Sequence, residues 1–189
     1  MMRFKFAGVE FSAHFLVVAL MSFAVITDTS EMVCICILSA VLHECGHLCA
    51  MFFFGIKPKR ITLRAFDIAI DAKTDKSILA DIIITLCGPL SNLLFALVFV
   101  CFSKRLFYSN IVIGLFNLIP VKTFDGGHAL HLFLMQFLSE KYADIVIGFI
   151  TFVLLIPLFI IGILVLFESR YNYSLLFISL YLAAILFMK

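Results

Sequence analysis

Long apolar runs, separated by short polar stretches, fill most of this chain of 189 residues. A helix needs roughly 20 apolar residues to cross the hydrocarbon core of a bilayer. The pattern therefore predicts an all-α polytopic membrane protein with about six transmembrane helices. The expected spans are Phe11–Ile26, Met32–Phe54, Ile78–Phe102, Leu106–Pro120, Ala143–Phe167 and Leu175–Met188.

Two features interrupt this regular pattern. The fourth run is short and ends in Asn117-Leu-Ile-Pro120, which predicts a broken or capped helix rather than a simple span. Pro89 and Pro157 lie inside the third and fifth runs, where proline removes a backbone hydrogen bond and favours a kink. The later apolar stretch Ala129–Leu138 is too short to span and is expected to form an interfacial helix or to continue the fourth run.

The one substantial polar loop covers Gly55–Ser77. Its stretch Ile61–Asp71 is rich in β-branched residues and partly alternates apolar with polar positions, which predicts a strand or a tight hairpin. We therefore expect a small β-like segment that is cytoplasmic or re-entrant. The alternative is a cytoplasmic loop with some interfacial apolar residues.

Composition supports the membrane class and excludes others. Hydrophobic residues make up 64% of the chain, charged residues 14%, and the mean hydropathy is +1.18. These values exclude intrinsic disorder and argue against a soluble domain. The net charge of +2 is too small to indicate nucleic-acid binding. We expect residues 1–189 to form a single membrane-embedded domain, without a cleavable signal peptide and without a disulfide framework among the six cysteines.

The distribution of lysine and arginine predicts the orientation, because cytoplasmic loops are enriched in these residues. With the N-terminus inside, eleven of the fourteen lie on the inner side and three on the outer side. The three outer residues are Lys104, Arg105 and Arg170. We therefore expect a multi-pass protein of the cell membrane with both termini in the cytoplasm.

The second run contains His43-Glu44-Cys45-Gly46-His47, which has the form H-E-x-x-H. On a helix, positions i and i+4 lie on one face, so both imidazoles can reach one Zn²⁺ with Glu44 beside them as general base. Ionisable groups inside a span are costly and are functional by default. The alternative is that the two histidines only form hydrogen bonds across the bundle.

A catalytic zinc site needs a third protein ligand and an open position for water. Asp125 is the preferred candidate, because it follows the broken fourth run and precedes two glycines that permit a turn or a close backbone approach. It can also serve as the N-cap of a following short helix. Glu140 or Glu168 would be the third ligand in a rival type of membrane metalloprotease. Among the other histidines, His128 and His131 are expected to be interfacial or polar-lining, and His14 to be structural or to contribute to an entrance.

Together these motifs resemble the site-2 proteases, a family of membrane-embedded zinc metalloproteases. The residues that carry the resemblance are His43-Glu44-x-x-His47, Gly88-Pro89-Leu90-Ser91-Asn92, and Asn117-x-x-Pro120 followed by Asp125-Gly126. Their order and spacing match a three-helix catalytic core over about residues 32–138. The segment Phe11–Phe15 also resembles the sporulation-associated branch, although this chain shows neither the CBS domain frequent in that branch nor a PDZ insertion.

The resemblance implies a function and roles for individual residues. His43, His47 and Asp125 would bind Zn²⁺, and Glu44 would be the general base. Asn117 would help to hold the substrate backbone or the oxyanion, and Asn92 would be a polar packing or substrate contact between spans. The expected activity is hydrolysis of peptide bonds in a membrane-tethered protein substrate within the lipid bilayer, at a site that opens toward the cytoplasm. The sequence does not indicate the oligomeric state.

One further alternative belongs to a different class of protein. In this alternative the chain is a non-catalytic membrane protein that binds a metal or a protein partner and hydrolyses no peptide bond. The intact set of predicted site residues argues against this alternative.

Overall fold

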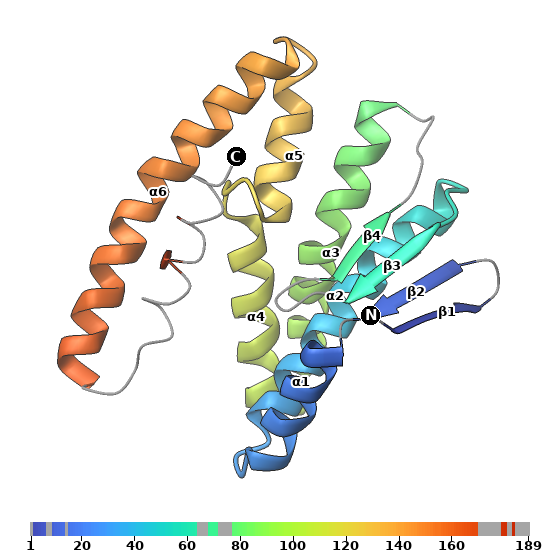
Figure 1. The fold of residues 1–189 in the computed structure, drawn as a ribbon. Helices are drawn as coiled ribbons and strands as arrows, with labels where there is room; N and C mark the ends of the chain where they lie inside the picture. The colour runs from blue at the N-terminus through green and yellow to red at the C-terminus, as the bar shows by residue number, and fades with distance from the viewer. Residues whose placement is uncertain are drawn as a thin grey trace. The chain divides into compact units, whose positions relative to one another are not determined.

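The computed structural model describes residues 2–6, 9–13, 15–63, 68–71, 77–169, 179–180 and 183. It divides the chain into two compact units, Met1–Phe116 and Asn117–Lys189. The described residues are mostly helical, with a small sheet in the first unit (Figure 1). Each unit is described by itself below.

The first unit contains four strands and the helices that carry most of the predicted core. The strands are β1 (Met2–Phe6), β2 (Val9–Ala13), β3 (Arg60–Leu63) and β4 (Ile68–Asp71). They form one sheet in the order β1-β2-β3-β4, with antiparallel outer pairs and a parallel pairing of β2 with β3. The helices are α1 (Phe15–Thr27), α2 (Met32–Phe53), α3 (Ile78–Phe99) and α4 (Lys104–Leu118), whose last two residues belong to the second unit.

The N-terminal hairpin corrects the expected start of the first span. That span was expected to begin at Phe11, but β2 continues to Ala13 and helix α1 begins only at Phe15. A strict alternation of apolar and charged or polar residues runs through Met2–Phe6 and resumes at Val9, which is the pattern of a half-buried strand. The signal was present, but the apolar run that follows it without a break obscured the boundary.

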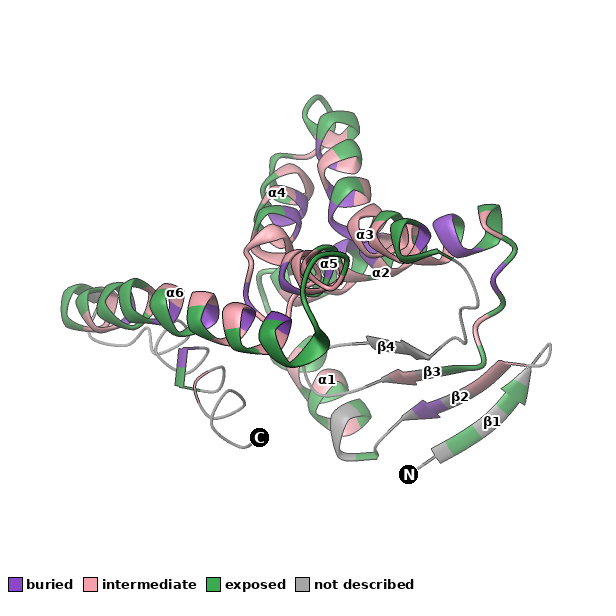
Figure 2. Cartoon of the chain, turned by 90° about the horizontal axis from the view of Figure 1, so that it is seen from above, coloured by how far each residue is buried: buried purple, intermediate pink, exposed green. Residues whose placement is uncertain are grey.

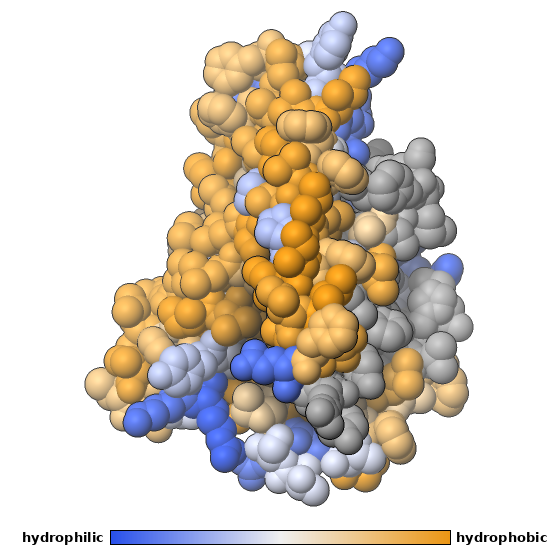
Figure 3. Space-filling model, turned by 90° about the vertical axis from the view of Figure 1, so that its left-hand side faces the viewer, coloured by the Kyte–Doolittle hydropathy of each residue, from blue (hydrophilic) through white to orange (hydrophobic). Residues whose placement is uncertain are grey.

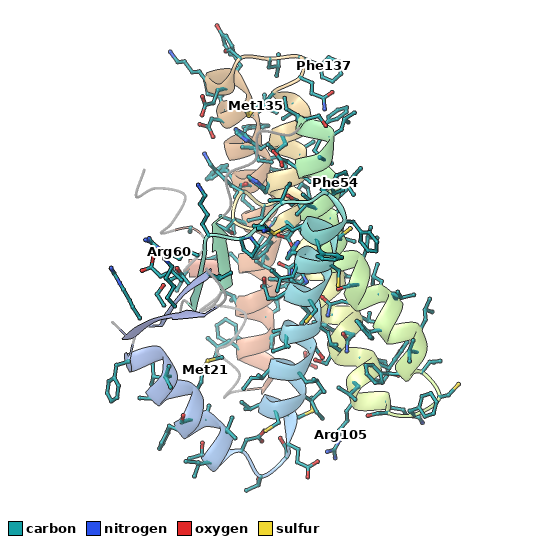
Figure 4. The ribbon with its side chains drawn as sticks, turned by 90° about the vertical axis from the view of Figure 1, so that its right-hand side faces the viewer. Met21, Phe54, Arg60, Arg105, Met135 and Phe137 are labelled. Carbon is teal, nitrogen blue, oxygen red and sulfur yellow. The ribbon has the colours of Figure 1, made fainter. Side chains whose placement is uncertain are left out.

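Strands β3 and β4 lie within the loop stretch that the alternation predicts to be β-like. Glu10 of β2 lies opposite Arg60 of β3, which is labelled in Figure 4. The Arg60 Nη2 atom is 3.1 Å from Glu10 Oε2. A hydroxyl pair links the same strands, with Ser12 Oγ 2.9 Å from Thr62 Oγ1. Cross-strand pairs of this kind favour this register of the parallel pairing.

The structure supports three of the six expected spans, and the other three stay a prediction. Among the described residues, three helices are long and apolar enough to cross a membrane, namely Met32–Phe53, Ile78–Phe99 and Glu140–Glu168. Helix α1 is shorter, at 13 residues, and α4 has 15, or about 22 Å at 1.5 Å per residue. Both are shorter than the roughly 30 Å hydrocarbon core. Most of the sixth expected run, Leu175–Met188, lies outside the described residues.

The turn before α2 is built around a single carboxylate. Asp28 accepts hydrogen bonds from the backbone N–H and the hydroxyl of Ser30 and from the backbone N–H of Val33, at 2.9, 2.5 and 2.6 Å. These donors, the Ser30 hydroxyl foremost, hold the pKa of Asp28 below its ordinary value of 3.8. Arg105 at the start of α4 donates to the Ser30 carbonyl at 3.1 Å, which ties the same turn to that helix (Figure 4).

The second unit contains α5 (Asp125–Leu134) and α6 (Glu140–Ser169). Helix α6 buries one stripe at a spacing of four residues, and the stripe consists of Ala143, Ile147, Thr151 and Leu155 (Figure 2). Large apolar side chains such as Phe149, Ile156 and Phe167 are exposed on the same helix. The hydrophobic surface on this side of the protein (Figure 3) is the kind that lipid covers.

The six cysteines all lie within the described residues and are free thiols.

Candidate metal centre

The two histidines of the H-E-x-x-H motif lie on one face near the middle of α2, one helical turn apart. His43 is buried, and the two rings meet edge to face with their centroids 4.8 Å apart. Their Nε2 atoms are 3.2 Å apart. The helix therefore brings two ring nitrogens together at one point.

The second nitrogen of each ring is held by helix α3. His47 Nδ1 lies 2.9 Å from the carbonyl oxygen of Ile84, which can only accept, so this nitrogen carries the proton. His43 Nδ1 lies 2.7 Å from Asn92 Oδ1 and donates to it. Because a neutral imidazole carries one ring proton, both Nε2 atoms present a lone pair toward each other.

Two lone pairs that face each other at this distance suit a cation between them rather than a hydrogen bond. In tetrahedral zinc sites the Zn–N distance is 2.0–2.1 Å, which separates two ligating nitrogens by about 3.3–3.4 Å. The observed 3.2 Å agrees with this separation. A carbonyl or amide oxygen on the opposite ring nitrogen is also typical of histidines that bind metals. The donor set therefore fits a zinc ion.

Two glycines provide the space that this arrangement needs. A Cβ on Gly88 of α3 would contact the His47 ring and would lie 2.8 Å from His43 Nε2. On Gly46 of α2, it would meet the Cys87 carbonyl and lie 2.5 Å from Ser91 Oγ. The Ser91 hydroxyl spans the same crossing, at 3.0 Å from the Leu42 carbonyl. Glycine at both positions lets α2 and α3 approach closely enough for α3 to hold both rings.

Glu44 directly follows the first histidine on α2 and is half-buried. Its position within one turn of both rings is the one that the motif predicts for a general base beside a metal.

Asn92 was expected to be a packing or substrate contact between spans, and its surroundings favour packing. It is fully buried, and its Nδ2 donates to the Ser39 carbonyl and to Asn110 Oδ1, both at 2.8 Å. With Oδ1 bound to His43, the amide is satisfied by protein groups. Asn92 therefore holds a histidine ring in place.

The prediction from sequence missed Ser39 and Asn110. Both are fully buried, and Asn110 Nδ2 lies 3.0 Å from Ser39 Oγ and 2.9 Å from the Leu106 carbonyl. The signal that could have found them is the same cost argument that singled out the histidines, since a polar side chain inside an apolar run needs a partner.

Asp125 belongs to the second unit, where it is the first residue of α5. Its Oδ2 atom is buried. The next two glycines press against the preceding loop: a Cβ on Gly126 would meet the carbonyl of Leu118, and one on Gly127 would meet that of Val121. The predicted need for close backbone approach at these glycines thus agrees with the packing of this loop.

The loop before Asp125 is also tied to α6. The backbone N–H of Lys122 donates to Thr151 Oγ1 at 2.9 Å, and its Nζ donates to Asp144 Oδ1 at 2.5 Å. His131 of α5 lies 3.5 Å from the same carboxylate oxygen, so its surroundings are polar, as expected. Together these contacts fix the loop against one helix.

The remaining candidates differ in burial and position. Asn117 is half-buried in the last turn of α4, and its role stays a prediction. Glu140 and Glu168 are exposed and lie near the two ends of α6. His128 is in the first turns of α5, and His14 lies outside the described residues.

Comparison with known proteins supports the relationship that the motifs predict. The family model described as Peptidase family M50 matches residues 102–158, which include the Asn117–Pro120 and Asp125–Gly126 motifs. Among solved structures, the chain is similar to the site-2 protease from Methanocaldococcus jannaschii, with a TM-score of 0.71 and 23% identity over 96% of this chain and 91% of that one. No curated protein sequence matches the chain. The resemblance to the site-2 proteases is thus confirmed, by a family model over part of the chain and by a shared fold over nearly all of it.

Proposed function

We propose that this protein is a zinc-dependent intramembrane endopeptidase of the site-2 type, which hydrolyses peptide bonds of membrane-tethered protein substrates. The observation that carries the proposal is the histidine pair of α2, whose two Nε2 lone pairs converge at 3.2 Å while helix α3 holds both Nδ1 atoms. Ionisable side chains inside a membrane span are costly and mark a functional site by default.

In this proposal the metal is held by His43, His47 and Asp125. The carboxylate of Asp125 is the preferred third ligand because it belongs to the Asp-Gly motif within the matched family segment, and because its loop is fixed by glycine packing and by α6. The exposure of Glu140 and Glu168 makes them weaker candidates.

The chemistry that a bound zinc ion supplies at such a site is acidification of a water molecule and polarisation of the peptide carbonyl. Glu44 accepts the proton of the attacking water and delivers it to the amine that leaves when the peptide bond breaks. Asn92 keeps the His43 ring oriented during the reaction. Asn117 is proposed to hold the substrate backbone or the oxyanion.

The substrate must reach this site as an extended chain, because a helix hides its peptide bonds. Strand β4 lies at one edge of the four-stranded sheet and can accept an added strand by backbone hydrogen bonds. We propose that part of Ile61–Ile70 pairs with the substrate in this way. The site is proposed to open toward the cytoplasm, with both termini on that side of the cell membrane.

Metal content and proteolysis of the detergent-purified protein test the proposal. Wild type should retain about one zinc per chain, and Asp125→Ala should lose both zinc and turnover of a membrane-tethered substrate. Glu140→Ala, the matched control, should keep both. Loss of zinc only in the Glu140 variant would overturn the choice of ligand.

The Glu44→Gln variant separates a protease from a non-catalytic metal-binding protein. It should retain zinc but lose turnover by several orders of magnitude, because the base is gone and the ligands are intact. Equal processing of a substrate by this variant and wild type would refute the protease function.

Proline substitution at Ala69 of β4 tests the edge strand, because proline cannot donate to a backbone ladder. Ala65, the other position expected to respond, lies outside the described residues. Turnover should fall while the zinc content stays the same. Unchanged turnover would exclude strand addition at this edge.

A further inference from the structure

A chain of hydrogen bonds leads from helix α4 to the proposed zinc site. It passes from the Leu106 carbonyl to Asn110, then to Asn92 and finally to His43. The three polar side chains in it are fully or almost fully buried. The successive donor–acceptor distances are 2.9, 2.8 and 2.7 Å. Helices α2, α3 and α4 each contribute a member, and all members belong to the first unit.

Two backbone carbonyls determine the direction of every bond in this chain. The Leu106 carbonyl can only accept, so the amide group of Asn110 that faces it must be the NH₂ group, and its Oδ1 must face Asn92. The Ser39 carbonyl likewise requires the NH₂ group of Asn92 on its side. The Oδ1 atom of Asn92 is then left to face His43 Nδ1, which must donate.

A reversed Asn92 would have the opposite effect on the site. Its NH₂ group would donate to His43 Nδ1, the ring proton would then sit on Nε2, and the lone pair that a metal needs would be lost. The reversed amide would also set its oxygen against the Ser39 carbonyl and against Asn110 Oδ1. Asn110 thus adds a second acceptor that penalises the wrong orientation, and the penalty is high because both amides are fully buried.

We propose that Asn110 is a positioning residue of the zinc site, which acts through Asn92 to fix the tautomer and ring orientation of His43. The inference rests on the zinc site proposed above, and it assigns to α4 a role in preparing a ligand on α2. In this orientation Asn110 Nδ2 also donates to the Ser39 hydroxyl at 3.0 Å.

Zinc affinity, measured by competition with a chromophoric chelator, tests the proposal without any need for catalysis. Asn92→Leu should weaken binding by about 10–100-fold, the usual cost of losing an outer-shell partner of a ligand. We expect Asn110→Leu, one bond further away, to weaken it by about 3–10-fold, and the double variant to be no weaker than Asn92→Leu alone. The visible absorption of the Co²⁺-substituted protein should change in both single variants, because the geometry of His43 changes.

Ser109→Ala is the matched control, since Ser109 is a buried neighbour on α4 whose hydroxyl contacts Cys36 Sγ at 3.8 Å and not the chain of amides. It should leave zinc affinity and the Co²⁺ spectrum as in wild type. If Asn110→Leu does not accumulate, Asn110→Ala removes the same amide without filling its space and carries the same expectation.

The proposal is overturned if the Asn110 variants bind zinc as tightly as wild type, or if their losses add to that of Asn92→Leu. Failure of the proposed function would look different, because wild type itself would then retain zinc without turnover or would bind no zinc at all.

Discussion

The two histidines and the aspartate are positioned by different means. Around His43 and His47, side chains and carbonyls of neighbouring helices hold the rings through buried hydrogen bonds. Around Asp125, the backbone itself is shaped, because two glycines let the loop at 118–122 pack onto the first turn of α5. The position of the two histidine rings therefore depends on which side chains meet at the helix crossing. The position of Asp125 depends on the absence of side chains at two glycines.

This difference predicts how substitutions around the histidines and substitutions around Asp125 lower zinc affinity and turnover. A histidine that loses one hydrogen-bond partner keeps its place in the helix, so we expect graded losses of zinc affinity from substitutions around the histidines. A loop that packs directly on a helix does not tolerate an added methyl group at the contact. The predictions below test this contrast at the glycines and polar contacts of each region, beginning with the largest expected effect.

Gly88→Ala should displace the histidine rings and so weaken zinc binding. The added methyl group would contact His47 and lie 2.8 Å from His43 Nε2, so at least one ring must turn away. We expect zinc affinity to fall by about 100-fold, at the upper end of what indirect changes to a metal site cost. Gly148→Ala on α6 is the control: its Cβ would meet nothing within 4 Å, and the variant should be unchanged or slightly more stable.

Gly127→Ala should act on the loop before Asp125 and leave the histidine rings in place. Its methyl group would collide with the Val121 carbonyl and lie 2.9 Å from the Lys122 nitrogen, which displaces the loop before Asp125. Turnover should fall by about 100-fold, since a displacement of about 1 Å can have this effect, while the histidine pair retains part of the zinc affinity. Equal losses in Gly127→Ala and Gly88→Ala, measured as zinc affinity, would contradict the proposed contrast.

Lys122→Met should have a smaller effect. Its ion pair with Asp144 is partly exposed, with 29% and 46% of the two side chains accessible, so the pair contributes at most about 1 kcal/mol. The backbone bond of residue 122 to Thr151 remains. We expect turnover to fall by about 2–5-fold and zinc content to be unchanged. Lys141→Met, an exposed lysine of α6, is the comparison that should show no change.

The smallest effect is expected at the turn before α2, which lies at the opposite end of the first half of α2 from the histidines. Since hydrogen bonds lower the pKa of Asp28 from 3.8, its contribution to stability is complete above about pH 4 and is lost as the pH falls through the lower folded-state value. Asp28→Ala should therefore lower the melting temperature near neutral pH and flatten its decline below pH 4. An equal decline in the variant would show that other carboxylates determine it.

That the two histidines share one face was predictable, because it depends on local helix geometry. Helix periodicity is sufficient to bring His43 and His47 to one face. Their partners were not predictable in the same way. Asn92 is 49 residues away from His43, and its contact depends on how α2 and α3 cross, which periodicity does not determine. Residues such as Asn110 need the three-dimensional packing before their role is visible.

The ends of the spans were less predictable than the position of the two histidines. Hydropathy treats a strand followed by a short helix as one apolar run, which explains the wrong start of the first span at Phe11. The alternation in Ile61–Asp71 was a better guide, and strands β3 and β4 lie there. Its position relative to the membrane stays a prediction.

The parallel pairing of β2 with β3 has a consequence for water. Between these two strands the chain runs down through α1, which is about 20 Å long, and back up through α2, which is about 33 Å long (Figure 1). Because α2 is longer than α1, the sheet is level with the middle of α2 and not with its end. Open strand edges are not tolerated in hydrocarbon, because their N–H and C=O groups would lack partners. If α2 spans the bilayer as predicted, the open edges of the sheet must lie against protein or against water at about the depth of His43 and His47. Where it lies against water, the sheet would form one wall of a channel that admits hydrolytic water and an unwound substrate from the aqueous side.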